Sequence, residues 1–149
     1  MKKMMLVGAV GTGKTTLTQR LNGTDIVYQK TQAIEHSVDI IDTPGEFTQR
    51  RHYYSALQVT SVEVDVIGLL QSVKENFATF PPGFTTMFSK HSIGIVTKID
   101  LATSTDEIAK AITSLKAAGA RQIFQVSATT NQGVAELLAF LAEEKEDGE

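Results

Sequence analysis

One segment near the start of the chain combines a glycine spacing with a Lys-Thr pair in the pattern G-x-x-x-x-G-K-[ST]. It reads Gly8-Ala9-Val10-Gly11-Thr12-Gly13-Lys14-Thr15 and is followed by Thr16. Glycines let the backbone approach an anion without Cβ clashes, and the N–H groups at the start of the next helix point at its phosphates. We expect Lys14 to reach the β and γ phosphates and the Thr15 hydroxyl to bind Mg²⁺. The alternative is a glycine-rich turn that only joins a strand to a helix.

A site of this type needs a carboxylate on the Mg²⁺ side, at the end of a neighbouring buried strand. Asp42 closes the apolar segment that starts at Val38, and Thr43-Pro44-Gly45 follow it. We therefore expect Asp42 to be a metal ligand and the Gly45 N–H to face the γ phosphate. An ordinary turn at a strand end is the alternative for this tetrapeptide.

The segment Thr97-Lys98-Ile99-Asp100 follows another apolar run and could select the base. The Asp100 carboxylate can accept hydrogen bonds from the guanine N1–H and exocyclic amine, a donor pair that adenine lacks, and the Lys98 stem can cover the ring face. Because a mismatched base leaves buried polar groups unpaired, one Asp can discriminate strongly. Ser127 and Ala128 could present backbone N–H groups to the guanine O6. The alternative for Asp100 is a surface residue that precedes a helix.

Each of these motifs needs a strand before it, and the sequence supplies short apolar runs that alternate with segments of helical period. The predicted strands are Lys3–Val7, Thr31–Glu35, Val38–Ile41, Val64–Leu70, Ser92–Thr97 and Gln122–Val126. The second and third are so close that only a hairpin can join them. We expect an α/β fold with a mostly parallel six-stranded sheet, one antiparallel edge strand and helices on both faces.

Two helices have readable ends. Ser104 and Glu107 have the spacing of a capping box, and Gly119 is placed to end that helix. An acidic segment follows the last helix, so we expect one nucleotide-binding domain over residues 1–142 and a solvated tail over 143–149. Phe77, Phe80, Phe84 and Phe88 surround a Pro81-Pro82-Gly83 turn, and either core packing around a helix or a docking surface could explain them.

Composition and net charge exclude some kinds of chemistry and disfavour some classes of partner. With 149 residues and no cysteine, the chain can form a core without disulfides and cannot use a thiol nucleophile. Its 14 Lys+Arg and 17 Asp+Glu give a net charge of −3, which disfavours nucleic acid and anionic membranes as partners. The N-terminal apolar run is short and interrupted by Gly8, so it predicts a strand rather than a signal peptide. We expect a soluble, cytoplasmic protein.

The order of the four motifs resembles the Ras-like translation-factor class of GTPases. More narrowly, the chain resembles the small P-loop family encoded with bacterial ethanolamine- and propanediol-utilisation microcompartments (EutP/PduV-like), and its propanediol branch more than its ethanolamine branch. The resemblance covers residues 1 to about 142. It is carried by Lys30-Thr31-Gln32-Ala33-Ile34, Asp42-Thr43-Pro44-Gly45-Glu46, Tyr54-Ser55-Ala56-Leu57, Phe80-Pro81-Pro82 and Ile93-Gly94-Ile95-Val96-Thr97-Lys98.

Departures from the Ras-like pattern concern the base and the catalytic residues. Thr97 replaces the usual Asn, which weakens the predicted guanine preference. Thr31 is the best-placed hydroxyl to close on Mg²⁺ and the γ phosphate, with Thr24 as the alternative. Glu46 stands where Ras-like enzymes keep a water-orienting Gln, and it is either a catalytic residue or only an acid in the first turn of a helix. We assign catalysis to Lys14, Glu46 and Thr31.

Two further positions bear on the rate. Val10 occupies a place that is Gly in Ras-like proteins that admit an arginine finger, so it should crowd a finger arriving there. Arg50 and Arg51 could serve in cis or be ordinary surface residues. We therefore expect slow intrinsic hydrolysis.

The resemblance implies a Mg²⁺-dependent GTP/GDP switch or accessory protein in microcompartment-linked metabolism, with shell or pathway proteins as partners. One alternative is a kinase that uses ATP and a short carboxylate such as acetate or propionate. Another is a nucleotide-dependent shell-docking protein with little turnover.

Overall fold

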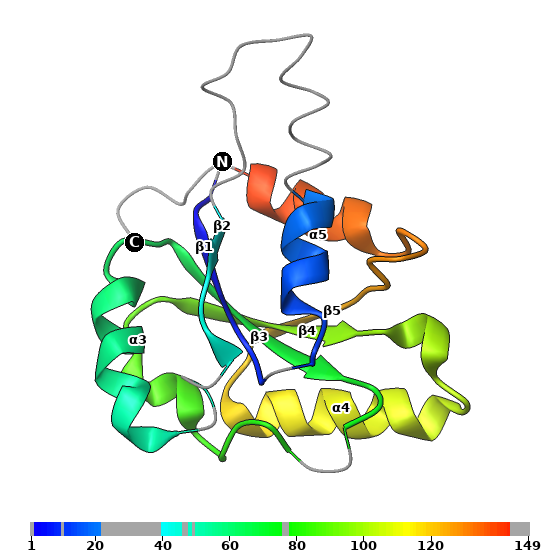
Figure 1. The fold of residues 1–149 in the computed structure, drawn as a ribbon, viewed down its shortest axis with the longest axis horizontal. Helices are drawn as coiled ribbons and strands as arrows, with labels where there is room; N and C mark the ends of the chain where they lie inside the picture. The colour runs from blue at the N-terminus through cyan, green and yellow to red at the C-terminus, as the bar shows by residue number, and fades with distance from the viewer. Residues whose placement is uncertain are drawn as a thin grey trace, which may run out of the picture.

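A central five-stranded parallel sheet organises the computed structural model, which describes residues 2–9, 11–21, 40–45, 48, 50–75 and 78–143 (Figure 1). The strands are β1 (Met4–Val7), β2 (Ile40–Asp42), β3 (Val66–Ser72), β4 (His91–Thr97) and β5 (Gln122–Gln125). Their order across the sheet is β2-β1-β3-β4-β5, and all four pairs are parallel. Because the strands are parallel, their carboxyl ends share one edge, where the predicted motifs lie.

Helices cover both faces of the sheet. The elements are a helix over residues 14–21, η1 (Arg51–Tyr53), α3 (Tyr54–Ser61), η2 (Phe84–Met87), η3 (Ile99–Leu101), α4 (Thr105–Ala118) and α5 (Val134–Ala142). The helix over 14–21 and α5 pack on one face through a cluster that includes Leu17 and Leu137. On the other face, α3 and α4 pack through a cluster that includes Leu57 and Leu115. The predicted α/β fold with helices on both faces is confirmed.

The central strands are mostly apolar because they are buried on both faces, and their polar residues lie near the strand ends. Every residue of β1 and β3 is buried, and in β4 only His91 is exposed. The predicted edge arrangement is not confirmed in full. β2 pairs in parallel with β1, and the proposed hairpin partner Thr31–Glu35 lies outside the described residues, as do residues 144–149 of the tail.

Three of the four phenylalanines around the proline turn are described, and all three are core residues. Phe80, Phe84 and Phe88 are at most 8% exposed and pack on one another, with ring centroids 4.9 and 5.7 Å apart in the two successive pairs. The helix expected after the proline turn is the single 3-10 turn η2, and Gly83 begins it with a φ of +74°. Phe77 lies outside the described residues.

The start of α4 corrects the predicted capping box. Ser104 is the N-cap but makes no side-chain cap bond. Instead, the Glu107 carboxylate accepts from the Thr103 backbone N–H at 3.1 Å and from the Thr103 hydroxyl. The C-terminal end is as predicted, since Gly119 has a φ of +115° and its N–H closes the last turn.

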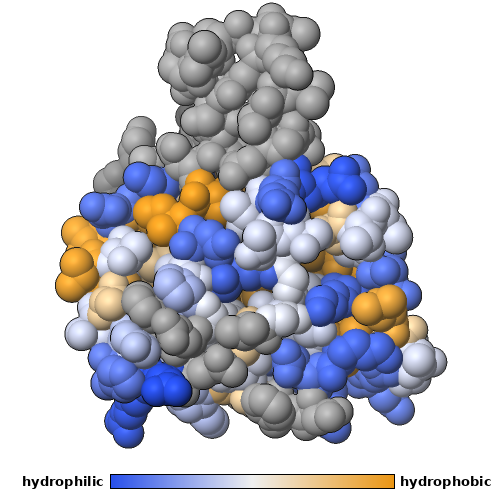
Figure 2. Space-filling view, viewed as in Figure 1, coloured by the Kyte–Doolittle hydropathy of each residue, from blue (hydrophilic) through white to orange (hydrophobic). Residues whose placement is uncertain are grey.

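The visible surface mixes polar and apolar side chains (Figure 2). Among the described residues, the large apolar side chains that stand exposed are Val59 and Val62 near the end of α3 and Leu101 in η3. None of the described helices has the length and apolar character needed to cross a membrane.

Candidate functional site

The predicted phosphate loop joins β1 to the helix over residues 14–21, as its sequence pattern requires. Gly11 and Gly13 have φ values of +87° and +91°, in the region that disfavours any residue with a Cβ. A Cβ on Gly8 would lie 2.9 Å from the Thr12 hydroxyl oxygen and 3.1 Å from the Leu70 Cβ. The Thr12 hydroxyl and N–H both donate to the Ala9 carbonyl, at 3.0 and 3.3 Å. The loop is thus tightly held against the end of β3.

Lys14 and Asp42 form an ion pair between the phosphate loop and the end of β2. The Lys14 ammonium lies 2.7 Å from Asp42 Oδ1, and Lys14 is only 9% exposed. The Asp42 side chain keeps 31% of its surface exposed. The following turn is anchored by Thr43, whose hydroxyl donates to the Leu6 carbonyl at 2.7 Å. The register of the sheet explains why the Asp42 turn lies beside the phosphate loop, because Asp42 of β2 is paired with Leu6 of β1.

The ion pair opens on a cavity of about 590 Å³ at the carboxyl edge of the sheet. The residues that line it come from the phosphate loop, the Asp42 turn and the base motif: Gly11, Gly13, Lys14, Thr15, Thr16, Asp42, Thr43, Pro44, Gly45 and Lys98. Three motifs predicted separately therefore meet around one space. Its size lies within the range of small-molecule sites.

The donors around this cavity suit Mg²⁺. The exposed Thr15 hydroxyl and the Asp42 carboxylate both line it, and Mg²⁺ prefers such oxygen ligands, completing its shell with water and phosphate oxygens. No group of three or more His, Cys, Asp or Glu side chains that could hold a metal occurs in the described part of the chain. Thr15 and Asp42 are the two predicted magnesium ligands that the structure describes, and the third, Thr31, lies outside the described residues.

A smaller cavity of about 80 Å³ adjoins the first one, with Gly13, Thr16 and Lys98 lining both. Lys98 adopts a left-handed conformation with φ +60° and ψ +35°, which is rare for a lysine. Its ammonium donates to the Gly11 carbonyl at 2.6 Å. The Lys98 stem therefore runs alongside the phosphate loop. Its predicted role as the cover of a base ring stays a prediction.

The Asp100 carboxylate, which also lines this small cavity, is held by hydroxyl groups. The Ser127 hydroxyl donates to Asp100 Oδ1 at 2.7 Å, and the Thr129 hydroxyl donates to Oδ2 at 3.4 Å. Asp100, Ala128 and Thr129 all line the cavity, whereas Ser127 is fully buried. Asp100 is exposed and precedes α4, as the surface alternative predicted, and its carboxylate is also oriented by two hydroxyl groups. Its role in base selection stays a prediction.

Thr97 connects the end of β4 to the phosphate loop. Its hydroxyl donates to the Thr12 carbonyl at 2.6 Å, and both residues are buried. Thr97 lacks the amide of the usual Asn, yet it still joins the two motifs through a hydrogen bond. The Thr97 hydroxyl therefore links the end of β4 to the phosphate loop, while the weaker guanine preference expected from the loss of the Asn stays a prediction.

Two contributors were missed by sequence reasoning. Thr129 could have been found as a second hydroxyl beside the Ser127-Ala128 pair. Arg20, one residue before the end of the described helix over residues 14–21, donates from Nε to the Ala128 carbonyl at 2.9 Å. The two residues are 108 positions apart, and nothing in the local sequence indicates their contact.

Several predicted site residues cannot be placed. Val10, Thr24, Thr31 and Glu46 lie outside the described residues. Arg50 and Arg51 are described and exposed. Of the three residues predicted to be catalytic, the structure therefore describes Lys14.

Comparison with known proteins places the chain in a family. The family model described as ethanolamine utilisation - propanediol utilisation, PduV-EutP, matches residues 1–143. The chain belongs to the PduV-EutP family. Within it, the propanediol utilization protein PduV of Citrobacter freundii is 45% identical over 141 residues, which cover 95% of this chain and 93% of that protein. The probable acetate kinase EutP of Salmonella typhimurium is 33% identical over 156 residues, covering 100% and 97% of the two chains.

Solved structures show that this PduV-EutP member has the fold of Ras-like P-loop GTPases. The FeoB G-domain of Methanococcus jannaschii matches with a TM-score of 0.65 and 17% identity, covering 95% of each chain. Era of Aquifex aeolicus bound to GDP.AlF4- matches with a TM-score of 0.66 and 19% identity, covering 98% of this chain and 59% of that one. At these identities the likeness establishes the fold.

Proposed function

We propose that the protein binds GTP and GDP with Mg²⁺ and hydrolyses GTP slowly, as a switch or accessory protein in ethanolamine or propanediol utilisation. The observation that carries the proposal is the Lys14–Asp42 pair at 2.7 Å on a 590 Å³ cavity that adjoins the Asp100 pocket. A cation, a magnesium-type carboxylate and a base-type carboxylate thus lie along one edge of the sheet. We assign this activity to a single domain over residues 1–142.

Lys14 supplies the charge that phosphates need. It is 9% exposed and its ammonium pairs with the Asp42 carboxylate on the wall of the cavity, where the β and γ phosphates of a bound nucleotide could take the place of that carboxylate. Asp42, released from Lys14, and Thr15 would then hold Mg²⁺, which offsets phosphate charge during transfer. The Gly45 N–H, on the same cavity, would complete the contacts to the γ phosphate.

Guanine selection rests on Asp100. Ser127 and Thr129 each occupy part of one carboxylate oxygen, but an ionised carboxylate has about four lone-pair sites and can still accept from the guanine N1–H and amine. The backbone N–H of Ala128 would face the guanine O6. The predicted second donor, the Ser127 backbone N–H, instead donates to the Gln132 carbonyl at 2.9 Å. The Arg20 bond to the Ala128 carbonyl stabilises the loop that carries both residues.

We expect slow turnover because of three residues that lie outside the described part of the chain, Val10, Thr31 and Glu46. Thr31 would close on Mg²⁺, and Glu46 replaces the glutamine that orients water in Ras-like enzymes. Val10 would hinder an arginine finger, whose contribution is about 10³ to 10⁵ in rate when present. Partners from the pathway or the microcompartment shell would then sense the nucleotide state.

A second candidate is an ATP-dependent small-carboxylate kinase, because relatives from Salmonella and Escherichia coli carry the description probable acetate kinase EutP. In that reaction a carboxylate oxygen attacks the γ phosphorus, the bond to the bridging oxygen breaks, and ADP leaves. Thr15, Lys14 and Asp42 would serve ATP-Mg²⁺ as they serve GTP-Mg²⁺. The base pocket with Asp100 favours the first candidate.

One experiment separates the two candidates. Purified protein is given GTP-Mg²⁺ or ATP-Mg²⁺, with and without acetate, and both free phosphate and hydroxylamine-trapped acyl phosphate are measured. The Lys14→Ala variant, prepared identically, reports contaminating activity. We expect slow phosphate release from GTP that acetate does not change. Acyl phosphate formed from ATP by the wild type and absent with Lys14→Ala would replace the GTPase proposal with the kinase.

A further inference from the structure

The peptide between Ser127 and Ala128 lies between two peptides that are each held by a hydrogen bond. On one side, the Ser127 N–H donates to the Gln132 carbonyl at 2.9 Å. On the other side, the Ala128 carbonyl accepts from Arg20 Nε, also at 2.9 Å. The Ala128 N–H between them donates to none of the described residues. This donor is therefore oriented from both sides and is available to a ligand.

The two bonds differ in origin. Gln132 belongs to the same loop as Ser127, and the two residues form an isolated antiparallel bridge. Arg20 belongs instead to the helix over residues 14–21, and 108 positions separate it from Ala128 (Figure 1). Loss of the Arg20 bond would free the peptide that follows Ala128, while the bond within the loop would remain. Arg20 therefore determines how this loop is placed relative to the helix.

The helix face that carries Arg20 also borders the predicted base pocket. From this helix and the residue before it, the cavity of about 80 Å³ is lined by Gly13, Thr16 and Leu17. Arg20 follows these residues at the i, i+3, i+4, i+7 spacing of one helix face. Ala128 lines the same cavity from the loop. The helix that begins with Lys14 at the phosphate site thus contacts the base loop near its other end.

The position of a purine that this N–H would face is the one that distinguishes guanine from adenine. Guanine has an acceptor there, its O6, whereas adenine has an amine that donates. A fixed N–H favours the acceptor and leaves the adenine amine opposite another donor. A peptide that is free to turn would lose this discrimination. A bond to the Ala128 carbonyl can therefore influence base preference without any contact to the nucleotide.

We propose that Arg20 is a positioning residue that keeps the Ala128 N–H directed at the O6 of a guanine nucleotide and thereby contributes to base preference. The inference rests on the proposed function, because it concerns the same nucleotide site. Arg20 acts through the backbone of the loop, so its contribution depends on the acceptor at position 6 of the base. An effect of its positive charge on the phosphates would not depend on that acceptor.

The test compares two nucleotides that differ in one atom. Calorimetry measures the affinities of GDP-Mg²⁺ and 6-thio-GDP-Mg²⁺ for the wild type and for Arg20→Gln. The sulfur of 6-thioguanine is a weaker acceptor than O6, while the groups that would face Asp100 are the same in both bases. Arg20→Gln should weaken GDP binding about threefold to tenfold, the effect of one hydrogen bond, and should weaken 6-thio-GDP binding less. The preference for GDP over 6-thio-GDP should therefore fall.

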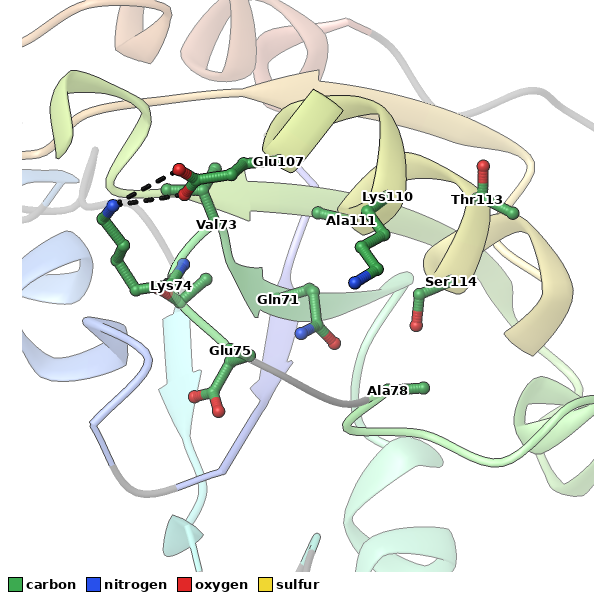
Figure 3. Close-up of a pocket in the computed structure, with 11 residues that line it drawn as sticks. Gln71, Val73, Lys74, Glu75, Ala78, Glu107, Lys110, Ala111, Thr113 and Ser114 are labelled. Atoms are coloured by element: carbon green, nitrogen blue, oxygen red, sulfur yellow. Dashed lines mark hydrogen bonds and ion pairs between the residues drawn. The ribbon is translucent and has the colours of Figure 1, made fainter. Parts of the chain in front are cut away.

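Lys110→Gln is the matched control, because it also removes one positive charge. Lys110 lies on α4 beside a different cavity, which shares none of its described lining residues with the nucleotide site (Figure 3). Both affinities should be the same in this variant as in the wild type. An equal loss of affinity in Lys110→Gln and Arg20→Gln would show an effect of charge alone and would overturn the inference.

Two other results would also overturn it. Equal losses for GDP and 6-thio-GDP in Arg20→Gln would mean that Arg20 does not act through O6. Unchanged GDP affinity in Arg20→Gln would mean that its bond does not position the N–H. These results would leave the proposed function intact, whereas a wild type that binds no GDP would overturn the proposed function and this inference together.

Discussion

Replacing Thr97 with valine removes one hydroxyl from the candidate site while nearly preserving the side-chain volume. The lost bond is the one to the Thr12 carbonyl, 2.6 Å long, between residues that are 4% and 0% exposed. Removing a buried donor and leaving its acceptor in place costs about 1–3 kcal/mol. Because the bond joins the end of β4 to the phosphate loop, we expect this cost to be shared between folding and nucleotide binding.

The assay for Thr97→Val measures both parts on the same preparation. Urea unfolding gives the change in the free energy of unfolding, and calorimetry gives the affinity for GDP-Mg²⁺. If about 1.4 kcal/mol of the cost falls on the nucleotide complex, the affinity drops about tenfold. The m-value of the urea transition should not change, since the fold is preserved.

Thr97→Ser is the matched control. It keeps the hydroxyl and loses a methyl group, so its free energy of unfolding should fall while its GDP affinity stays close to that of the wild type. If Thr97→Val matches the wild type in both stability and affinity, or if Thr97→Ser loses as much affinity as Thr97→Val, then the hydroxyl bond does not couple β4 to the loop.

Three other changes test separate parts of the account. Asp100→Asn should shift binding from guanine toward xanthine nucleotides, because the 2-oxo group of xanthine accepts where guanine donates; competition between GDP and XDP measures this. Glu46→Gln should raise single-turnover GTP hydrolysis if Glu46 faces the γ phosphate, whereas a tenfold fall, about 1.4 kcal/mol of barrier, would make it a catalytic base. Bonds from Thr103 and then from Lys74 hold the pKa of Glu107 below its usual 4.5. The stability advantage over Glu107→Gln should therefore be fully present above pH 4.5 and shrink as pH falls through the lowered pKa, which acid titration of both proteins would detect.

The elements that could be predicted from sequence are those whose signal is local. β1 and β4 were expected from continuous apolar runs and are found within one residue of the predicted bounds. The end of α4 at Gly119 was likewise marked by a residue that tolerates positive φ. For the strands the cause is burial on both faces, which requires apolar residues. For the helix end it is the backbone freedom of glycine, so the residue types alone indicate both.

Boundaries and some helices depend on partners elsewhere in the chain. β3 was expected to begin at Val64, but its ladder begins at Val66, opposite Met4, and the Val64 N–H instead donates to Ser61 in a turn. α3 was not predicted from periodicity, since Val59 is 73% exposed on it. Apolar character alone indicates neither where a ladder starts nor which residues a helix leaves exposed.

The candidate site shows the same division. The positions of Lys14, Asp42 and Asp100 at one sheet edge follow from motifs at the ends of parallel strands. The contacts that hold these motifs together join residues 85 or more positions apart: Thr97 to Thr12, Lys98 to Gly11 and Arg20 to Ala128. Such pairings depend on the folded arrangement of strands and loops, so single-sequence reasoning had no means of finding them.

The central claim is that Lys14 and Asp100 act on one nucleotide, and a single calorimetric comparison tests it. GTP and ATP, each with Mg²⁺, are titrated into the wild type and into Lys14→Ala, whose fold is verified by circular dichroism. We predict that the wild type binds GTP more tightly than ATP. We also predict that Lys14→Ala weakens GTP binding by a factor of about 100 or more, because contacts to a charged group contribute about 1.5–3 kcal/mol each and two phosphates lose theirs. Equal affinities for GTP and ATP, or unchanged GTP affinity in a folded Lys14→Ala protein, would contradict the claim.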